Sequence, residues 1–266
     1  QARAYEALQG KEEAQEAYDE AIQGYSQQVR QGRLDLRLPL AEAYNARADL
    51  NRRCGRIEQA VEDFTRSLAF QAQLIECEEQ SNLRPFRAQA YHGRGDCLAA
   101  LLRRREALQD YDKSIEDYLF GLNSGKLQQG DLRKLATVYF DSGQLHQDLG
   151  EPSQAADRAT SAIRLLEERL SGTAEEAVAQ AHLLQAEALF QLGDIHTGLE
   201  SASKAIQALS LRVRGGSCNL ERQLAQAHRL RAGLSHRLGD LNQALKDYGL
   251  SFHLYGGEGL EPDRLQ

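Results

Sequence analysis

The sequence predicts an all-α fold, a solenoid of antiparallel helical hairpins, from its composition and from two recurring patterns. The 266 residues are rich in the strong helix formers Ala, Leu, Gln, Glu and Arg, whereas Val, Ile and Thr are sparse. This composition favours helices and argues against a large sheet. Glycine recurs at near-constant intervals between helical segments, and small and aromatic residues recur at fixed distances from it. One helical unit therefore repeats along the chain.

The predicted turn of each hairpin is a glycine, which accepts the left-handed backbone conformation that ends a helix. After the turn at Gly55, Ala60, Phe64 and Ser67 lie on one face of a helix. The small residues let two antiparallel helices approach closely, and the aromatic ring fills the space beside them. The turn positions lie 43 to 48 residues apart, with leucine in place of glycine once: Gly10, Gly55, Leu102, Gly150, Gly193 and Gly239.

A second helix precedes each turn. It carries an aromatic residue or histidine eleven residues before the turn and a small residue seven before it, as at Tyr44 and Ala48. His182 and His228 hold the aromatic position in two units, and we interpret both as packing residues. The helices predicted from these patterns span residues 1–9, 11–31, 36–54, 56–80, 84–102, 104–121, 128–149, 151–171, 173–192, 194–213, 218–238 and 240–254.

The small–aromatic–small pattern resembles the tetratricopeptide repeat, most clearly at Ala60/Phe64/Ser67, Ala107/Tyr111/Ser114 and Ala244/Tyr248/Ser251. The resemblance implies a single right-handed superhelical solenoid over residues 1–255, followed by a flexible tail at 256–266. The period is about 46 residues rather than about 34, and the closing proline is absent, so we expect a long-repeat variant. Its five and a half repeats are 1–31, 36–80, 84–121, 128–171, 173–213 and 218–254.

Charge and cysteine usage limit the class of partner and the setting. The net charge of −7 disfavours nucleic acid as a partner. Arg30 to Arg105 contains 14 Lys/Arg against 10 Asp/Glu, which indicates solvated helix faces or a basic half that attracts an acidic partner. No apolar run approaches membrane-spanning length, so we expect no membrane partner. Four cysteines without C-x-x-C spacing favour a reduced, cytoplasmic setting, and the absence of Met predicts a piece of a longer protein.

No residue pattern points to catalysis or to a cofactor. The P-loop, G-x-S-x-G and H-E-x-x-H motifs are absent. Gly93-Arg94-Gly95-Asp96 begins like a dinucleotide-binding loop, but it lies within a predicted helix and no strand precedes it. His92 and Asp96 lie four residues apart on one helix face and could offer two metal ligands, but no third ligand is evident. We therefore expect no enzyme activity, no cofactor and no metal site.

The resemblance also implies a binding surface, because in tetratricopeptide proteins the first helices of successive units line the concave side where peptides lie. Transferring that register predicts a groove with a polar lining and a few apolar anchors. Phe140 and Phe190 are candidate anchors, with core packing as an equal alternative for each. Gln89, Leu183 and Gln226 also occupy predicted groove-lining positions on the first helices. The candidate partner-binding residues are Asn45, Asp49, Arg52, His92, Asp96, Phe140, Gln144, Glu187, Arg229 and His236.

The sequence bears on two classes of charged ligand, a peptide C-terminal carboxylate and an acidic segment. The family's clamp for a peptide C-terminal carboxylate needs Lys and two Asn on one first helix. Asn45 matches one Asn, but Asp49 would repel the ligand carboxylate and the predicted groove contains no Lys. The arginines at 103–105, with Arg52, Arg53 and Arg56, are interpreted as ion-paired surface residues. A docking edge for an acidic segment is the alternative.

The sequence thus predicts a non-catalytic protein–protein interaction scaffold that binds a peptide or helical segment of a partner in its concave groove. One alternative is a ligand-responsive regulatory or sensor domain of a larger signalling protein. Another is a self-assembly module that forms a homo-oligomer through the solenoid ends, because solenoids need capped ends.

Overall fold

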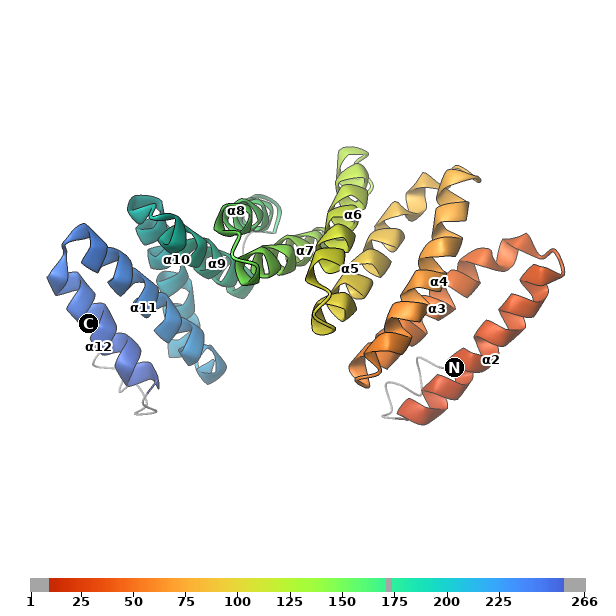
Figure 1. Ribbon diagram of the computed structural model, residues 1–266, viewed down its shortest axis with the longest axis horizontal. Helices are drawn as coiled ribbons and strands as arrows, with labels where there is room; N and C mark the ends of the chain where they lie inside the picture. The colour runs from red at the N-terminus through yellow and green to blue at the C-terminus, as the bar shows by residue number, and fades with distance from the viewer. Residues whose placement is uncertain (1–9, 171–173, 256–266) are drawn as a thin grey trace. The chain divides into compact units, whose positions relative to one another are not determined.

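The computed structural model describes residues 10–170 and 174–255, which contain eleven α-helices, three short 3-10 helices and no strand (Figure 1). The predicted all-α fold is confirmed. The predicted helix at 1–9 and the predicted tail at 256–266 lie outside the described residues. The α-helices are α2 (Lys11–Arg30), α3 (Arg37–Arg53), α4 (Ile57–Glu76), α5 (Arg84–Ala100), α6 (Arg104–Asn123), α7 (Gln129–Asp148), α8 (Pro152–Arg169), α9 (Glu175–Leu192), α10 (Ile195–Arg214), α11 (Glu221–Leu238) and α12 (Leu241–Tyr255). The 3-10 helices are η1 (Leu34–Leu36), η2 (Ser81–Leu83) and η3 (Cys218–Leu220).

The chain divides into two compact units between Val138 and Tyr139, within α7. In unit 1 (residues 1–138), α3 packs against α4 and α5 against α6 as helical hairpins. In unit 2 (residues 139–266), α9 packs against α10 and α11 against α12. Successive hairpins are joined by contacts of α4 with α5 and of α10 with α11. This succession of packed pairs is the arrangement of an α-solenoid, while the extent of one solenoid over residues 1–255 stays a prediction.

The helices are amphipathic, which is why each can be covered on one side by its neighbours. In α4, Phe64 and Leu68 are buried, whereas Glu62 and Arg66 are exposed and form an ion pair at 3.7 Å. Among the described helices, none combines the length and apolar character that crossing a membrane requires.

The predicted and observed helix ends differ at the end of α4. The sequence pattern predicted a helix to residue 80, but α4 ends at Glu76. Glu79 takes a left-handed φ of +56°, which interrupts a right-handed helix, and the chain then enters η2. The N–H of Gln80 donates to the carbonyl of Leu74 at 3.1 Å, so the helix end keeps a hydrogen-bond partner. The hairpins are therefore joined by a short irregular link and not by a longer helix.

The five hairpin turns share one backbone conformation, as the glycine register predicted. In each turn, the N–H of the residue after the turn position donates to the carbonyl five residues before it, at 2.8 to 3.1 Å. This bond is characteristic of the Schellman motif that ends helices. All five turn residues have positive φ: Gly55 (76°), Leu102 (61°), Gly150 (73°), Gly193 (79°) and Gly239 (92°).

The substitution Leu102→Gly is expected to raise the free energy of unfolding by about 0.5–1 kcal/mol. The left-handed conformation costs a leucine more than a glycine, and this gain exceeds the extra chain entropy that glycine has in the unfolded state. Little packing is lost, since Leu102 is 74% exposed. Urea unfolding of the two chains measures the difference. The reverse change at the equivalent turn, Gly55→Leu, is the matched control and should destabilise the chain; equal stability of Leu102→Gly and the parent would contradict the proposed strain.

The small residues of the first helices have the predicted role in helix packing. A Cβ atom added at Gly95 would lie 2.7 Å from the ring of Tyr111 in the same hairpin. A Cβ atom added at Gly93 would lie 2.4 Å from the ring of Phe64 in the preceding hairpin. Both distances are shorter than van der Waals contact, so α5 lies against two aromatic rings only because glycine occupies both positions.

Candidate partner-binding site

A buried ion pair joins the two helices of three hairpins and fixes which face of each first helix points outward. In each pair, the arginine donates two N–H bonds of 2.6 to 2.8 Å to an aspartate sixteen residues later. The aspartate side chains are at most 4% exposed. Bidentate contacts of this kind restrain rotation of one helix against the other. The pairs are Arg47–Asp63, Arg94–Asp110 and Arg231–Asp247.

The other two hairpins of the register carry different residue pairs at the same positions, Gln185 with Ser201 and Ser142 with Arg158. Ser201 donates to the side-chain oxygen of Gln185 at 2.7 Å. Ser142 is fully buried, and on the facing helix the guanidinium of Arg158 lies 5.9 Å from the ring centroid of Tyr139. The arginine–aspartate pair at these two positions is therefore not repeated in the hairpins that turn at Gly150 and Gly193.

The candidate residues of unit 1 form an ionic cluster on α3 and α5. Arg52 lies 3.5 Å from the carboxylate of Asp49 and 3.5 Å from that of Asp96. His92 Nε2 lies 3.4 Å from Asp96, and the hydroxyl of Tyr111 donates to Asp96 at 3.0 Å. These side chains satisfy one another, so a charged partner would have to compete with contacts that already exist.

Two further properties of this cluster bear on the ligand that it could take. Asn45 is only 8% exposed and lies beneath the surface, so it offers a partner little contact area. Partial burial raises the pKa of Asp49, and the nearby Arg52 charge opposes this shift. Both acidic groups, Asp49 and Asp96, would repel a carboxylate ligand, which agrees with the argument against a carboxylate clamp.

The arginines near the turns of unit 1 are held by neighbouring side chains and backbone. Arg103 donates to Glu106 at 2.8 and 2.6 Å, and this hydrogen bond holds the pKa of Glu106 below its usual value. Arg56 donates to Gln15 at 2.9 Å, and Arg53 donates to the carbonyl of Asp49 at 3.3 Å. These contacts match the interpretation of a solvated, ion-paired surface.

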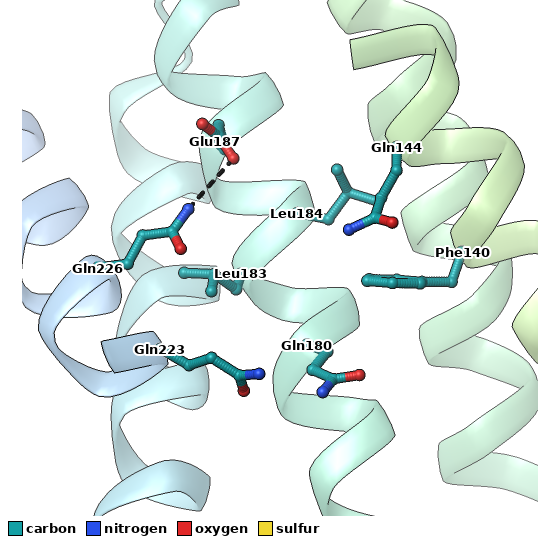
Figure 2. A pocket seen from close by; sticks show the side chains of 8 residues that line it. All are labelled: Phe140, Gln144, Gln180, Leu183, Leu184, Glu187, Gln223 and Gln226. Atoms are coloured by element: carbon teal, nitrogen blue, oxygen red, sulfur yellow. Dashed lines mark hydrogen bonds between the residues drawn. The ribbon is translucent and has the colours of Figure 1, made fainter. Parts of the chain in front are cut away.

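In unit 2, the candidate residues Phe140, Gln144 and Glu187 lie around one pocket of about 210 Å³ (Figure 2). The pocket is built from α7, α9 and α11, the first helices of three successive hairpins. Within each helix the lining residues are three or four positions apart, so each helix contributes a single face. The full lining is Phe140, Gln144, Gln180, Leu183, Leu184, Glu187, Gln223 and Gln226.

The pocket has an apolar middle, amides at one end and a carboxylate at the other (Figure 2). Figure 2 shows Gln180 and Gln223 at one end, Glu187 at the other, and Leu183 between them. Gln226 donates to the carboxylate of Glu187 across a long 3.5 Å contact. The side-chain oxygen of Gln223 is buried without a hydrogen-bond partner among the described residues. The pocket thus presents one unused buried acceptor and one carboxylate, and its lining contains no cation.

The remaining predicted residues of unit 2 lie elsewhere. Arg229 and His236 are exposed on α11 and are not part of the pocket lining. Phe190, an alternative anchor, is covered: the guanidinium of Arg237 lies 3.7 Å from its ring centroid. Arg237 also donates to the carbonyl of Phe190 at 2.6 Å, and a Cβ at Gly233 would meet the ring at 2.9 Å. Packing within the repeat therefore accounts for Phe190.

The sequence register did not identify three pocket residues, Gln180, Leu184 and Gln223. Gln180 and Gln223 lie three positions before Leu183 and Gln226, which the register did contain. A helix presents residues three and four apart on one face, so this spacing was the available signal. The missing information was how far each lining extends along its helix, because that depends on the packing of neighbouring hairpins.

His182 and His228 are buried as predicted, but each also has an acidic neighbour. His228 Nδ1 lies 2.7 Å from Asp247, and His182 Nε2 lies 3.3 Å from Glu167. Burial lowers the pKa of His182, and the hydrogen bond with Glu167 opposes this shift. Both histidines pack between helices and lie outside the pocket lining.

The fold and the pocket together define a class: a helical-hairpin repeat protein in which first helices of successive hairpins line a pocket. Residues 41–73 match the family model described as tetratricopeptide repeat. These residues begin within α3 and end within α4, so the match covers one of the hairpins derived from the sequence. The predicted resemblance to the tetratricopeptide repeat is confirmed for this hairpin, residues 41–73. The assignment of the chain to a long-repeat variant stays a prediction.

Solved structures share this fold at low sequence identity. BtubC (BKLC) from P. vanneervenii matches with a TM-score of 0.63 and 14% identity, over 93% of this chain and 91% of that chain. YrrB, described as a TPR protein with an unusual peptide-binding site, matches with a TM-score of 0.59 and 14% identity, over 90% and 95%. PilF of Pseudomonas aeruginosa matches with a TM-score of 0.52 and 21% identity, over 93% and 95%. A search of curated protein sequences finds no significant match. At these identities the likeness shows the fold alone.

Proposed function

We propose that this chain is a non-catalytic protein–protein interaction scaffold, and that the pocket of unit 2 binds a peptide or helical segment of a partner. The convergence of α7, α9 and α11 on one pocket carries the proposal (Figure 2). Each helix belongs to a different hairpin, so a ligand in the pocket would contact three repeats at once. Surfaces of this kind suit elongated ligands. The peptide-binding site named for YrrB is consistent with such a use of the shared fold.

The size of the pocket favours one ligand side chain over a whole small molecule. Pockets for drug-sized ligands usually measure about 300–1,000 Å³. The volume of about 210 Å³ in unit 2 is smaller. One branched or aromatic side chain could fill it, while the rest of the ligand segment would lie along the first helices.

The lining indicates the chemistry of that segment. Phe140, Leu183 and Leu184 provide apolar contact for an inserted side chain. The amides of Gln180 and Gln223 can both donate to and accept from the peptide backbone of the ligand. Because Glu187 is the charged residue of the lining, an N–H donor or a basic group is favoured beside the apolar side chain, and a carboxylate is disfavoured.

A displayed random peptide library, selected on the purified chain, tests this proposal. The selected peptides should combine an apolar residue with a neighbouring basic residue. Their affinity, measured by fluorescence anisotropy, should fall about tenfold or more in Phe140→Ala, as expected for an apolar contact at the centre of a site.

The matched control is Leu211→Ala, because Leu211 is an apolar residue of unit 2 that is 65% exposed and lies outside the pocket. It should leave the affinity unchanged. Circular dichroism and the melting temperature establish that both variants are folded. Equal affinities of folded Phe140→Ala and the parent chain for every selected peptide would refute the pocket as the binding site.

A further inference from the structure

Helix α12 presents a stripe of exposed apolar side chains. Its residues lie alternately four and three positions apart and therefore share one face of the helix. Scattered exposed apolar side chains are ordinary on protein surfaces, but five on one face of a fifteen-residue helix form a contiguous patch. We name this set the α12 stripe: Leu241 (57% exposed), Leu245 (71%), Tyr248 (44%), Phe252 (75%) and Tyr255 (53%).

The repeat register shows that this stripe corresponds to a packing surface in every other hairpin. Tyr248, Phe252 and Tyr255 lie nine, thirteen and sixteen positions after the turn at Gly239. The residues at the same positions after the other four turns are all buried, with at most 8% of their surface exposed. They are Phe64, Leu68 and Gln71 in α4; Tyr111, Ile115 and Tyr118 in α6; Ala159, Ile163 and Leu166 in α8; and Ala202, Ile206 and Leu209 in α10.

The structure also shows what covers such a surface. Phe64 and Leu68 of α4 belong to one apolar cluster with Ala90 and Cys97 of the next first helix, α5. Gly93 of α5 lies directly against the ring of Phe64. In unit 2, the α10 residues form a cluster with α11 in the same way. The established occupant of this position is thus the first helix of a following hairpin, with small residues where the second helix carries a large ring.

We propose that the α12 stripe is a docking surface for an amphipathic α-helix of a partner protein, which takes the place of a following first helix. Tyr248 is in register with Phe64, so the partner helix carries glycine or alanine opposite Tyr248 and further small or apolar residues one turn to either side. Such a helix continues the series of contacts that α4 makes with α5 and α10 makes with α11. The docking surface is separate from the pocket and does not depend on the function proposed for it.

A second folded copy of this chain fits the stripe less well. Among the described helices, the first helices α3, α5, α9 and α11 each already lie between two second helices. A folded copy therefore has none of these small-residue faces to offer. Among the described helices, the exposed apolar face that such a copy presents is its own α12 stripe, which would place large side chains against large side chains where the repeat places small residues.

A synthetic peptide with the sequence of residues 81–100 is a suitable probe, because it contains α5, the helix that covers the equivalent face of α4. The fluorescein-labelled peptide should bind the intact chain saturably in an anisotropy titration. Phe252→Glu and Leu245→Glu should each weaken binding about tenfold or more by placing a charge on the stripe. Both side chains are more than two-thirds exposed, so neither substitution removes a buried contact.

Three controls make the result specific. The Gly93→Leu form of the peptide should lose binding, because leucine cannot lie against Tyr248. Phe140→Ala in the pocket should leave peptide binding unchanged. A scrambled peptide should not bind.

Absence of saturable binding, or equal binding to the parent chain and the folded glutamate variants, would overturn the proposal. So would a molar mass that doubles with concentration in light scattering and returns to the monomer value in Phe252→Glu, because a second copy would then be the occupant.

Discussion

Replacing Asp247 by alanine is expected to lower the free energy of unfolding by about 3 kcal/mol, the largest loss from any single side chain on α12. The carboxylate is fully buried and accepts hydrogen bonds from Arg231 at 2.7 and 2.8 Å and from Gln243 at 2.8 Å. His228 Nδ1 lies 2.7 Å from it. Removing the carboxylate leaves His228 and Arg231 without their shared acidic partner. The loss stays near the lower end of the usual range because Arg231, 21% exposed, can turn toward solvent.

Urea unfolding followed by circular dichroism measures this loss, and hydrogen exchange should place it in α11 and α12. The control is Asp157→Ala, which removes an exposed aspartate of α8 and should change stability by no more than about 0.5 kcal/mol. A folded Asp247→Ala chain with the stability of the parent would show that the pair does not restrain the two helices.

The same carboxyl group predicts a pH dependence. Burial opposes ionisation of Asp247, but hydrogen bonds from His228, Arg231 and Gln243 outweigh it and hold the pKa of this carboxyl well below its usual range. The ionised group therefore stabilises the fold at pH values above the unfolded-state pKa of about 4. Its contribution is lost as the pH falls toward the folded-state pKa. The stability difference between the parent and Asp247→Asn should accordingly be largest near neutral pH and shrink below about pH 4.

The turns and helices of this fold could be derived from the sequence because local backbone requirements produce them. Gly55 and Gly239 occupy left-handed positions that few other residues adopt, and the small and aromatic residues stand at fixed distances from them. Even Leu102, which breaks the glycine rule, was placed correctly by the spacing of its neighbours, and it adopts φ +61°. The end of α4 is the exception. The positive φ there belongs to Glu79, which is not a glycine, so the sequence did not predict a break in the helix at this position.

The candidate site could be derived only in part, because its geometry depends on contacts between helices. The register correctly placed Phe140, Gln144 and Glu187 on first helices, but the pocket also needs the amide of Gln223 from the next hairpin. The ion pair between Arg94 and Asp110 could not be predicted from the sequence either. A spacing of sixteen residues between two charged side chains predicts no contact by itself. The contact can be predicted only when the two helices are known to pack antiparallel in a particular register.

Gly93→Ala is expected to lower the free energy of unfolding by about 2 kcal/mol, although alanine is the better helix former. On an exposed helix the change from glycine to alanine would stabilise by up to about 1 kcal/mol. At Gly93 the new Cβ would lie 2.4, 2.9 and 3.0 Å from three ring atoms of Phe64. The ring is 2% exposed and enclosed by Ala48, Ala60 and Leu68, so it cannot move away without opening the cluster between α4 and α5. Overpacking therefore outweighs the gain in helix propensity.

A double-mutant cycle identifies this overpacking as the cause. Phe64→Leu alone removes ring atoms and should destabilise the parent chain, but in the Gly93→Ala background it also removes the clash. The two losses should therefore fall short of additivity by about 1 kcal/mol or more. Gly24→Ala in α2 is the control for propensity, since a Cβ there meets no atom within 4 Å and should stabilise the chain. Two results would contradict this: strictly additive losses, or a Gly93→Ala chain that is as stable as the Gly24→Ala chain. Either result would mean that α5 can shift away from Phe64 and relieve the clash. The close approach of the two helices would then not depend on glycine.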